Sequence, residues 1–179
     1  MNEAPPLVVD LDGTLTARGT IYACLCRLAR ERPWELPRLL ASLVRGRAVC
    51  KDHLAHLVDL APERLPYRPQ VLAFLRAERA RGRRLILATA TPRRVADAVA
   101  RHLELFEVVL ASDRTRHLVG AAKRTAIREA VRGGAFDYMG DKPADLPIFQ
   151  AARLAILVHP SKRLLTRAQA SCRVGHVFD

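Results

Sequence analysis

Short apolar runs recur along the chain, and longer amphipathic stretches separate them. The apolar runs have the length of buried β-strands and lie at residues 7–9, 84–89, 107–111, 136–139, 154–158 and 173–177. The stretches between them repeat their apolar positions with helical spacing, which predicts helices at 69–81, 92–102, 121–132, 144–151 and 161–170. Pro69 and Pro92 stand where a helix starts, and Gly82 and Gly133 where one stops. This alternation predicts an α/β fold with a parallel sheet covered on both faces.

The stretch from residue 20 to 65 interrupts the alternation. It contains no strand-like run, only three amphipathic patterns at 21–30, 35–45 and 49–60. Because it directly follows the first strand, its helices are expected to stand over the carboxyl end of that strand, where ligands of open α/β sheets bind. The sequence therefore predicts a core from residues 1–19 and 66–179 and a helical cap from residues 20–65.

The first strand is followed at once by Asp10-Leu11-Asp12-Gly13-Thr14-Leu15-Thr16. In an extended segment the carboxylates of Asp10 and Asp12 project to the same side. One of them could attack a phosphorus atom while the other handles the proton of the leaving group. Gly13 allows the chain to turn sharply out of the sheet.

This heptapeptide resembles the first motif of the haloacid dehalogenase-like superfamily, in its phosphatase branch. Three further motifs of that superfamily follow in order, at Thr89, at Lys123, and in the loop Gly140-Asp141-Lys142-Pro143-Ala144-Asp145. The resemblance extends over residues 7–160. It implies a Rossmann-like three-layer core with the parallel strand order 3-2-1-4-5 and a small helical cap inserted after the first strand.

The resemblance also implies a catalytic role for four matched residues. Asp10 would attack phosphorus, and Asp12 would protonate the leaving group and later activate water. Thr89 would hydrogen-bond the transferring phosphoryl group, and Lys123 would neutralise charge on the nucleophile and the phosphoryl oxygens. Dehalogenases of this superfamily lack the second aspartate, so Asp12 favours phosphoryl transfer through an aspartyl-phosphate.

A magnesium site is implied at the same edge. Strands one and four are neighbours in the 3-2-1-4-5 order, so the carboxylates of Asp10, Asp12 and Asp141 are expected to meet there and to hold Mg²⁺, with Asp145 in support. Lys142 departs from the motif, because a small or polar residue commonly follows the Gly-Asp pair. A contact with phosphate and an outward orientation are both open for its side chain.

The charge balance has several interpretations. The formal net charge is +12, and Arg accounts for 26 of the 30 basic residues. Such a charge suits a phosphorylated substrate, an anionic membrane or nucleic acid, but the arginines are scattered, which argues against a nucleic-acid interface and also fits GC-rich codon usage. Arg93 and Arg94 lie near the expected catalytic edge and are candidate substrate contacts; a solvated first helical turn is the alternative.

Targeting signals and disulfide patterns are not apparent. No apolar run reaches the roughly 20 residues that span a bilayer, and the amino terminus shows no signal-peptide pattern. Four cysteines form neither a disulfide framework nor a zinc pattern. A cytoplasmic enzyme with reduced thiols is therefore expected.

The stretches 65–69, 87–91, 109–113 and 136–141 look like the phosphatase-like domains fused to polyprenyl-type intramembrane prenyltransferases. This likeness implies a prenyl-linked or sugar phosphate as substrate, and peripheral contact with an anionic membrane or with a separate prenyltransferase.

The leading hypothesis is a Mg²⁺-dependent phosphatase that hydrolyses a small or medium phosphomonoester. One alternative is a catalytically idle domain that binds a phosphorylated ligand or a membrane partner. Another is a phosphotransferase of the same superfamily. The intact set of four motifs favours the enzyme.

Overall fold

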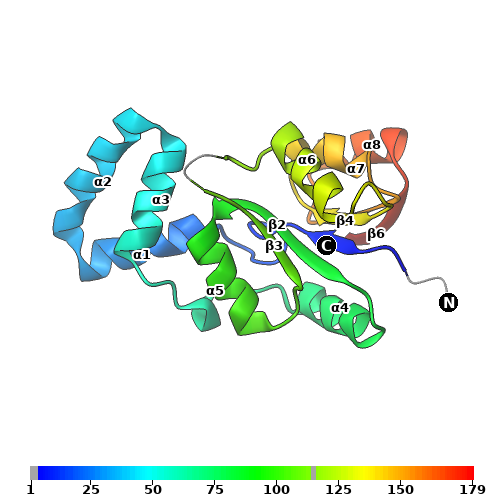
Figure 1. The fold of residues 1–179 in the computed structure, drawn as a ribbon, viewed down its shortest axis with the longest axis horizontal. Helices are drawn as coiled ribbons and strands as arrows, with labels where there is room; N and C mark the ends of the chain where they lie inside the picture. Colours follow the sequence, from blue (N-terminus) through cyan, green and yellow to red (C-terminus); the bar gives the residue numbers. More distant parts are fainter. Residues whose placement is uncertain (1–3, 114–115) are drawn as a thin grey trace.

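A single parallel sheet forms the centre of the molecule. The computed structural model describes residues 4–113 and 116–179, and within them six strands pair in the order β3-β2-β1-β4-β5-β6 (Figure 1). The strands are β1 (Leu7–Val9), β2 (Leu85–Pro92), β3 (Val108–Ser112), β4 (Asp137–Gly140), β5 (Leu154–Val158) and β6 (Val174–Phe178). All neighbouring strands are parallel. The predicted order 3-2-1-4-5 is confirmed, and the sixth strand adds to the edge beside β5.

Both faces of the sheet are buried, which explains why its central strands are continuously apolar. In β1, Leu7 and Val9 belong to the core cluster on one face, and Val8 belongs to the cluster on the other. Helices α4 (Pro69–Ala80) and α5 (Arg93–Leu103) cover the first face. Helices α6 (Ala121–Ala130), α7 (Leu146–Phe149) and α8 (Lys162–Ser171) cover the second (Figure 1).

One predicted helix is shorter than expected. The pattern at 144–151 forms a 3₁₀ turn, η4 (Pro143–Asp145), followed by the single helical turn of α7. Pro147 has no backbone N–H, so it cannot donate to the carbonyl four residues earlier, as a continuous helix through this stretch would require.

The segment between β1 and β2 is helical. It consists of α1 (Thr20–Glu31), η1 (Pro33–Glu35), α2 (Leu36–Ser42), η2 (Leu43–Arg45), α3 (Arg47–Leu57) and η3 (Pro62–Arg64). The helix expected over 35–45 is thus α-helical only in its middle. Cys24, Leu28, Leu39 and Leu54 form a buried cluster of this segment, and Val95 of α5 joins it to the rest of the chain. Figure 1 shows α1–α3 standing beside one end of the sheet.

The strand register determines which residues meet at that end. Val9, the last residue of β1, pairs with Leu87 of β2 and with Met139 of β4. The backbone N–H of Asp10 donates to the carbonyl of Met139 at 2.9 Å. The chain therefore leaves β1 between two longer neighbours, and their carboxyl ends flank the turn that begins at Asp10.

No helix among the described residues has the length and apolar character needed to cross a membrane.

Candidate active site

Asp10 and Lys123 form a buried ion pair at the carboxyl edge of β1. Oδ1 of Asp10 accepts a hydrogen bond from Nζ of Lys123 at 2.8 Å, and both side chains are almost fully buried. Lys123 lies in the first turn of α6. Its ammonium also lies 5.3 Å from the centre of the Tyr138 ring and 3.5 Å from Oδ1 of Asp145. The structure thus brings together the first and third sequence motifs.

The lysines around Asp10 keep it ionised. Burial alone raises the pKa of a carboxylic acid, but the positive charges of Lys123 and Lys142, together with the hydrogen bond from Lys123, outweigh burial and hold the pKa of Asp10 below its usual value. A buried carboxylate that remains negatively charged and is shielded from water is a suitable nucleophile.

Asp12 is held by two threonines. Its Oδ1 accepts the backbone N–H of Thr20 at 2.6 Å, and its Oδ2 accepts the hydroxyl of Thr91 at 2.5 Å. The Thr20 and Thr91 hydroxyls lie 3.3 Å apart. Thr20 is the first residue of α1, and Thr91 belongs to β2. The Asp12 carboxylate therefore connects the turn after β1 with both the helical segment and the neighbouring strand.

The turn after Asp12 fits closely against Asp141. Gly13 has φ +94°, and a Cβ atom there would lie 2.0 Å from Oδ2 of Asp141. Thr14 donates its hydroxyl to Oδ1 of Asp141 at 2.9 Å. Only glycine permits both the backbone conformation and the close approach of the carboxylate.

Asp141 is less readily ionised than Asp10. Burial raises the pKa of Asp141 to about 6. The negative charge of Asp10 adds to this rise, whereas the positive charge of Lys142 and the hydrogen bond from Thr14 oppose it. A positive charge beside it would favour its ionised form.

Lys142 is turned towards these carboxylates. Its Nζ donates a hydrogen bond to the main-chain carbonyl of Asp12, and lies 3.4 Å from Oδ2 of Asp10 and 3.7 Å from Oδ1 of Asp141. Burial alone would lower the pKa of Lys142. The negative charges of the surrounding aspartates have the larger combined effect, so the pKa of Lys142 lies above its usual value. The outward orientation that the sequence left open is not observed.

The oxygen atoms around Lys142 have the chemistry of a magnesium site. Two carboxylates, Asp10 and Asp141, and the carbonyl of Asp12 are hard oxygen donors of the kind that Mg²⁺ prefers, and they already surround a positive charge. The Asp12 carboxylate was predicted to be a metal ligand. In the structure this carboxylate is bonded to Thr20 and Thr91, and it is the main-chain carbonyl of Asp12 that lies beside the Lys142 ammonium. Across the described residues, no three His, Cys, Asp or Glu side chains surround a common point.

Thr89 and Asp145 lie in the same region. Thr89 is buried near the end of β2, and its hydroxyl accepts the backbone N–H of Thr91 at 3.1 Å. Asp145 is buried beside Lys123, and burial raises its pKa. The expected role of Thr89, to hydrogen-bond the transferring phosphoryl group, and that of Asp145, to support the metal site, stay predictions.

Arg93 and Arg94 have other partners. The Arg93 guanidinium lies 3.4 Å from the carbonyl of Val109 and 3.7 Å from Asp97, while Arg94 forms an ion pair with Asp59 at 2.5 Å. Arg94 thus links α5 to the segment after α3. Neither contact joins these arginines to the catalytic carboxylates.

Sequence reasoning missed Thr14, Thr20, Thr91 and Tyr138. Thr91 could have been predicted from its spacing: it lies two residues after Thr89 at the end of a strand, and side chains two residues apart in a strand point to the same side. Thr20 and Tyr138 gave no such signal, since their contacts depend on how distant segments pack.

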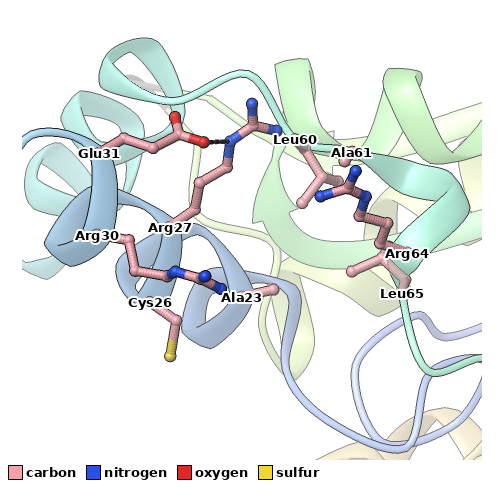
Figure 2. Close-up of a pocket in the computed structure, with 9 residues that line it drawn as sticks. All are labelled: Ala23, Cys26, Arg27, Arg30, Glu31, Leu60, Ala61, Arg64 and Leu65. Atoms are coloured by element: carbon pink, nitrogen blue, oxygen red, sulfur yellow. Dashed lines mark hydrogen bonds and ion pairs between the residues drawn. The ribbon is translucent and has the colours of Figure 1, made fainter.

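A basic pocket lies on the helical segment, between α1 and residues 60–65. Its volume is about 480 Å³, and Figure 2 shows Arg27, Arg30 and Arg64 around it, with Leu60 and Leu65 among its apolar lining. Arg27 is bound by Glu31 at 2.8 Å and by the carbonyl of Asp59 at 2.6 Å. None of the catalytic candidates lines this pocket.

The strand order and the buried aspartate–lysine pair at the end of β1 define a Rossmann-like α/β protein with a cluster of charged residues at the carboxyl edge of its sheet. Residues 7–150 match the family model described as haloacid dehalogenase-like hydrolase, and the chain belongs to this family.

Three individual proteins resemble this chain in sequence or in fold. The uncharacterized protein y4nM of Sinorhizobium fredii (strain NBRC 101917 / NGR234) is 36% identical over 153 residues, which are 86% of this chain and 30% of that protein. A protein of unknown function from Bordetella pertussis Tohama I has a similar structure, with a TM-score of 0.72 and 20% identity over 99% of both chains. A substrate-bound phosphoserine phosphatase gives a TM-score of 0.65 at 14% identity, covering 99% of this chain and 94% of the other. The two structures support the fold.

Proposed function

We propose that this protein is a Mg²⁺-dependent phosphatase that hydrolyses a small or medium phosphomonoester through an aspartyl-phosphate on Asp10. The observation that carries the proposal is the buried, ionised carboxylate of Asp10. It accepts a hydrogen bond from Lys123, it lies near the ammonium of Lys142, and a second carboxylate, Asp12, follows two residues later. Membership of a hydrolase family whose fold is shared by phosphoserine phosphatases supports it.

The first half of the reaction transfers the phosphoryl group to the enzyme. A carboxylate oxygen of Asp10 attacks phosphorus, the bond from phosphorus to the ester oxygen breaks, and Asp12 gives a proton to the departing alkoxide. Thr20 and Thr91 hold the Asp12 carboxyl group in one orientation for this transfer. The products are a free alcohol and an aspartyl-phosphate.

The second half releases phosphate. Asp12, now ionised, takes a proton from a water molecule, whose oxygen attacks the phosphorus of the aspartyl-phosphate. The bond between phosphorus and the Asp10 oxygen breaks, which restores the Asp10 carboxylate. Lys123 stabilises the negative charge on Asp10 and on the phosphoryl oxygens throughout, and Thr89 hydrogen-bonds the phosphoryl group.

Magnesium would be held by the Asp10 and Asp141 carboxylates and by Asp12. When bound, it supplies positive charge that offsets the repulsion between these carboxylates and an anionic substrate. Asp145 supports the site through Lys123.

The substrate is proposed to carry a compact phosphorylated group, because the first residue of α1, Thr20, is bonded to Asp12 and α3 lies near the carboxyl ends of β2 and β3. The basic pocket lies on the same helical segment that bonds Asp12 through Thr20, so the positive field of its arginines would favour a second anionic group on that substrate, such as a carboxylate or a second phosphate.

A screen of phosphomonoesters with Mg²⁺, scored by released inorganic phosphate, tests this function. Hydrolysis should stop with excess chelator and return with Mg²⁺, whereas Ca²⁺ should fail because its larger and looser coordination shell misplaces the phosphoryl group. Full turnover in excess chelator would contradict the proposed metal dependence. Absence of phosphate release across the whole screen, from a folded protein, would contradict the phosphatase itself.

A further inference from the structure

The ammonium group of Lys142 lies among the oxygen atoms that are proposed to hold the metal. It contacts the Asp12 carbonyl, Oδ2 of Asp10 and Oδ1 of Asp141, which come from the end of β1, the turn after it and the loop after β4. Mg²⁺ prefers hard oxygen ligands of this kind, so an ion held by Asp10, Asp141 and the Asp12 carbonyl would compete with this ammonium for the same oxygen atoms.

The side chain of Lys142 has a route out of this position. It is 46% exposed, whereas the side chains of Asp10 and Asp141 are only 4% and 17% exposed. The Lys142 carbonyl accepts the N–H of Asp145 at 3.0 Å, which anchors the backbone of the loop. Rotation about the side-chain bonds alone can thus move the ammonium into solvent. Lys123, by contrast, is buried between Asp10 and Asp145 and has no such route.

We propose that Lys142 is a tethered cation that fills the metal position in the metal-free protein and must swing out before Mg²⁺ binds. Lys142 then sets the Mg²⁺ concentration at which the site fills, and it neutralises the clustered carboxylates until that concentration is reached. This inference rests on the proposed function in one respect, namely that Asp10 and Asp141 are the carboxylates that hold the metal.

The size of the effect follows from the contacts that metal binding would break. Hydrogen bonds between charged groups contribute a factor of about ten to a hundred to an equilibrium constant. Removing the ammonium should therefore tighten metal binding by about that factor. Because the site is largely shielded from solvent, exposed lysines elsewhere should have no comparable effect.

Calorimetric titration of the substrate-free protein with Mg²⁺, and separately with Mn²⁺, measures this directly. Lys142→Met and Lys142→Gln should bind both ions about 10 to 100 times more tightly than the wild type. Lys142→Arg keeps the positive charge and should not gain affinity. Lys162→Met makes the same charge change at an exposed residue of α8 and should leave affinity unchanged.

The outcomes separate this inference from the proposed function. Affinities of the two uncharged variants within twofold of wild type would overturn the inference, even if the protein hydrolyses phosphomonoesters. Tighter binding in both variants would support it, even if no substrate is hydrolysed. Failure of every folded variant to bind either ion would overturn it together with the proposed metal site.

Chemical labelling of lysines provides a second readout. The sequence has four lysines, Lys51, Lys123, Lys142 and Lys162, so mass spectrometry can follow each one separately. If Mg²⁺ displaces the Lys142 side chain, acetylation of Lys142 by acetic anhydride should become severalfold faster in saturating Mg²⁺, while that of Lys162 stays constant. An unchanged or slower rate at Lys142 would contradict displacement.

Discussion

At the scale of single residues, Asp10 and Asp12 differ through their partners rather than through their chemistry. Asp10 is buried against the Lys123 ammonium, which favours a permanent negative charge. Asp12 instead accepts hydrogen bonds from an amide and a hydroxyl, and neither of these donors carries a charge. Under the proposed function, Asp10 would serve as the nucleophile and Asp12 as the proton carrier two residues later.

Asp10→Asn keeps the shape of the side chain and removes its negative charge. We expect turnover to fall by several orders of magnitude, which is the scale observed when catalytic nucleophiles are removed. Released phosphate measured on the best substrate of the screen gives the answer, and circular dichroism controls for folding. Residual activity within tenfold of wild type would rule out Asp10 as nucleophile.

Thr91 is expected to act as a positioning residue for Asp12. Thr91→Val removes the hydroxyl that donates to Oδ2 of Asp12, so the carboxyl group is less well aligned for proton transfer, and kcat should fall about 10- to 100-fold with little change in KM. Thr91→Ser retains the hydroxyl and should recover most of the lost kcat. Equal losses in both variants, or a loss confined to KM, would assign Thr91 a packing role instead.

At the scale of elements, the two ends of the sheet have different tasks. The carboxyl ends hold the candidate catalytic residues, whereas the amino ends of β1, β2 and β4 are joined by Arg83. Its guanidinium donates to the carbonyl of Pro5 at 2.8 Å, to Glu78 at 2.7 Å, and to the buried Asp137. Arg153, just before β5, donates to the same Asp137 at 2.6 Å. This network fixes the relative positions of strands whose other ends form the site.

Arg83→Met should lower stability without affecting chemistry. The Arg83 side chain is 7% exposed and its partner Asp137 1%, and breaking a buried ion pair of this kind costs about 3 kcal/mol. For a chain of this length, that corresponds to a decrease in Tm of roughly 6–12 °C. Thermal unfolding measures it, and kcat at 25 °C should stay near wild type.

The neighbouring residue offers a matched control. Arg84 pairs with Glu107 at 3.3 Å, but its side chain is 47% exposed. Arg84→Met should therefore cost less than about 1 kcal/mol. Similar losses in the two variants would show that the buried network is not what stabilises the amino ends of the strands.

At the scale of the whole molecule, the helical segment and the catalytic edge are joined by specific contacts. Thr20 of α1 bonds Asp12, and Arg94 of α5 bonds Asp59 after α3. The segment also carries its own buried cluster, which includes Val95 of α5. Under the proposed function, this segment would act as a lid that excludes water from a compact substrate and leaves little access for a folded protein.

Small phosphomonoesters should therefore be much better substrates than a phosphoprotein. A substrate with a second anionic group should gain further from the basic pocket, and the gain should shrink at high ionic strength because salt screens it. Released phosphate at low and high salt, for singly and doubly anionic esters and for a phosphoprotein, measures both effects. Equal or faster hydrolysis of the phosphoprotein would contradict this account of specificity.

A pair of variants tests the pocket itself. Arg30→Gln removes one charge from its lining, whereas Arg128→Gln removes one from the exposed side of α6. Only Arg30→Gln should raise the KM of the doubly anionic ester. If both variants raise KM equally, the gain comes from the net charge of the protein and not from the pocket.

The positions of the strands and of the motifs could be predicted from the sequence, because both depend on local patterns. Apolar runs such as 7–9 and 154–158 form strands where both faces are covered, and the motif residues follow strands or begin helices. The strand order was implied by the family resemblance that these motifs carry, and the fold confirms it. The family membership agrees with the resemblance, whereas the burial of Asp10 and Lys123 was not predicted and became visible only in the folded chain.

Only the tertiary structure decided how the side chains of the site are directed. The inward Lys142, the Asp12 carboxylate on Thr20 and Thr91, and the engagement of Arg94 by Asp59 all join residues from different elements. A side chain can take several rotamers, and the choice among them depends on charges and donors brought close by folding, which no local pattern records. For this reason the sequence could name Lys142 as unusual, while its place among the carboxylates required the folded chain.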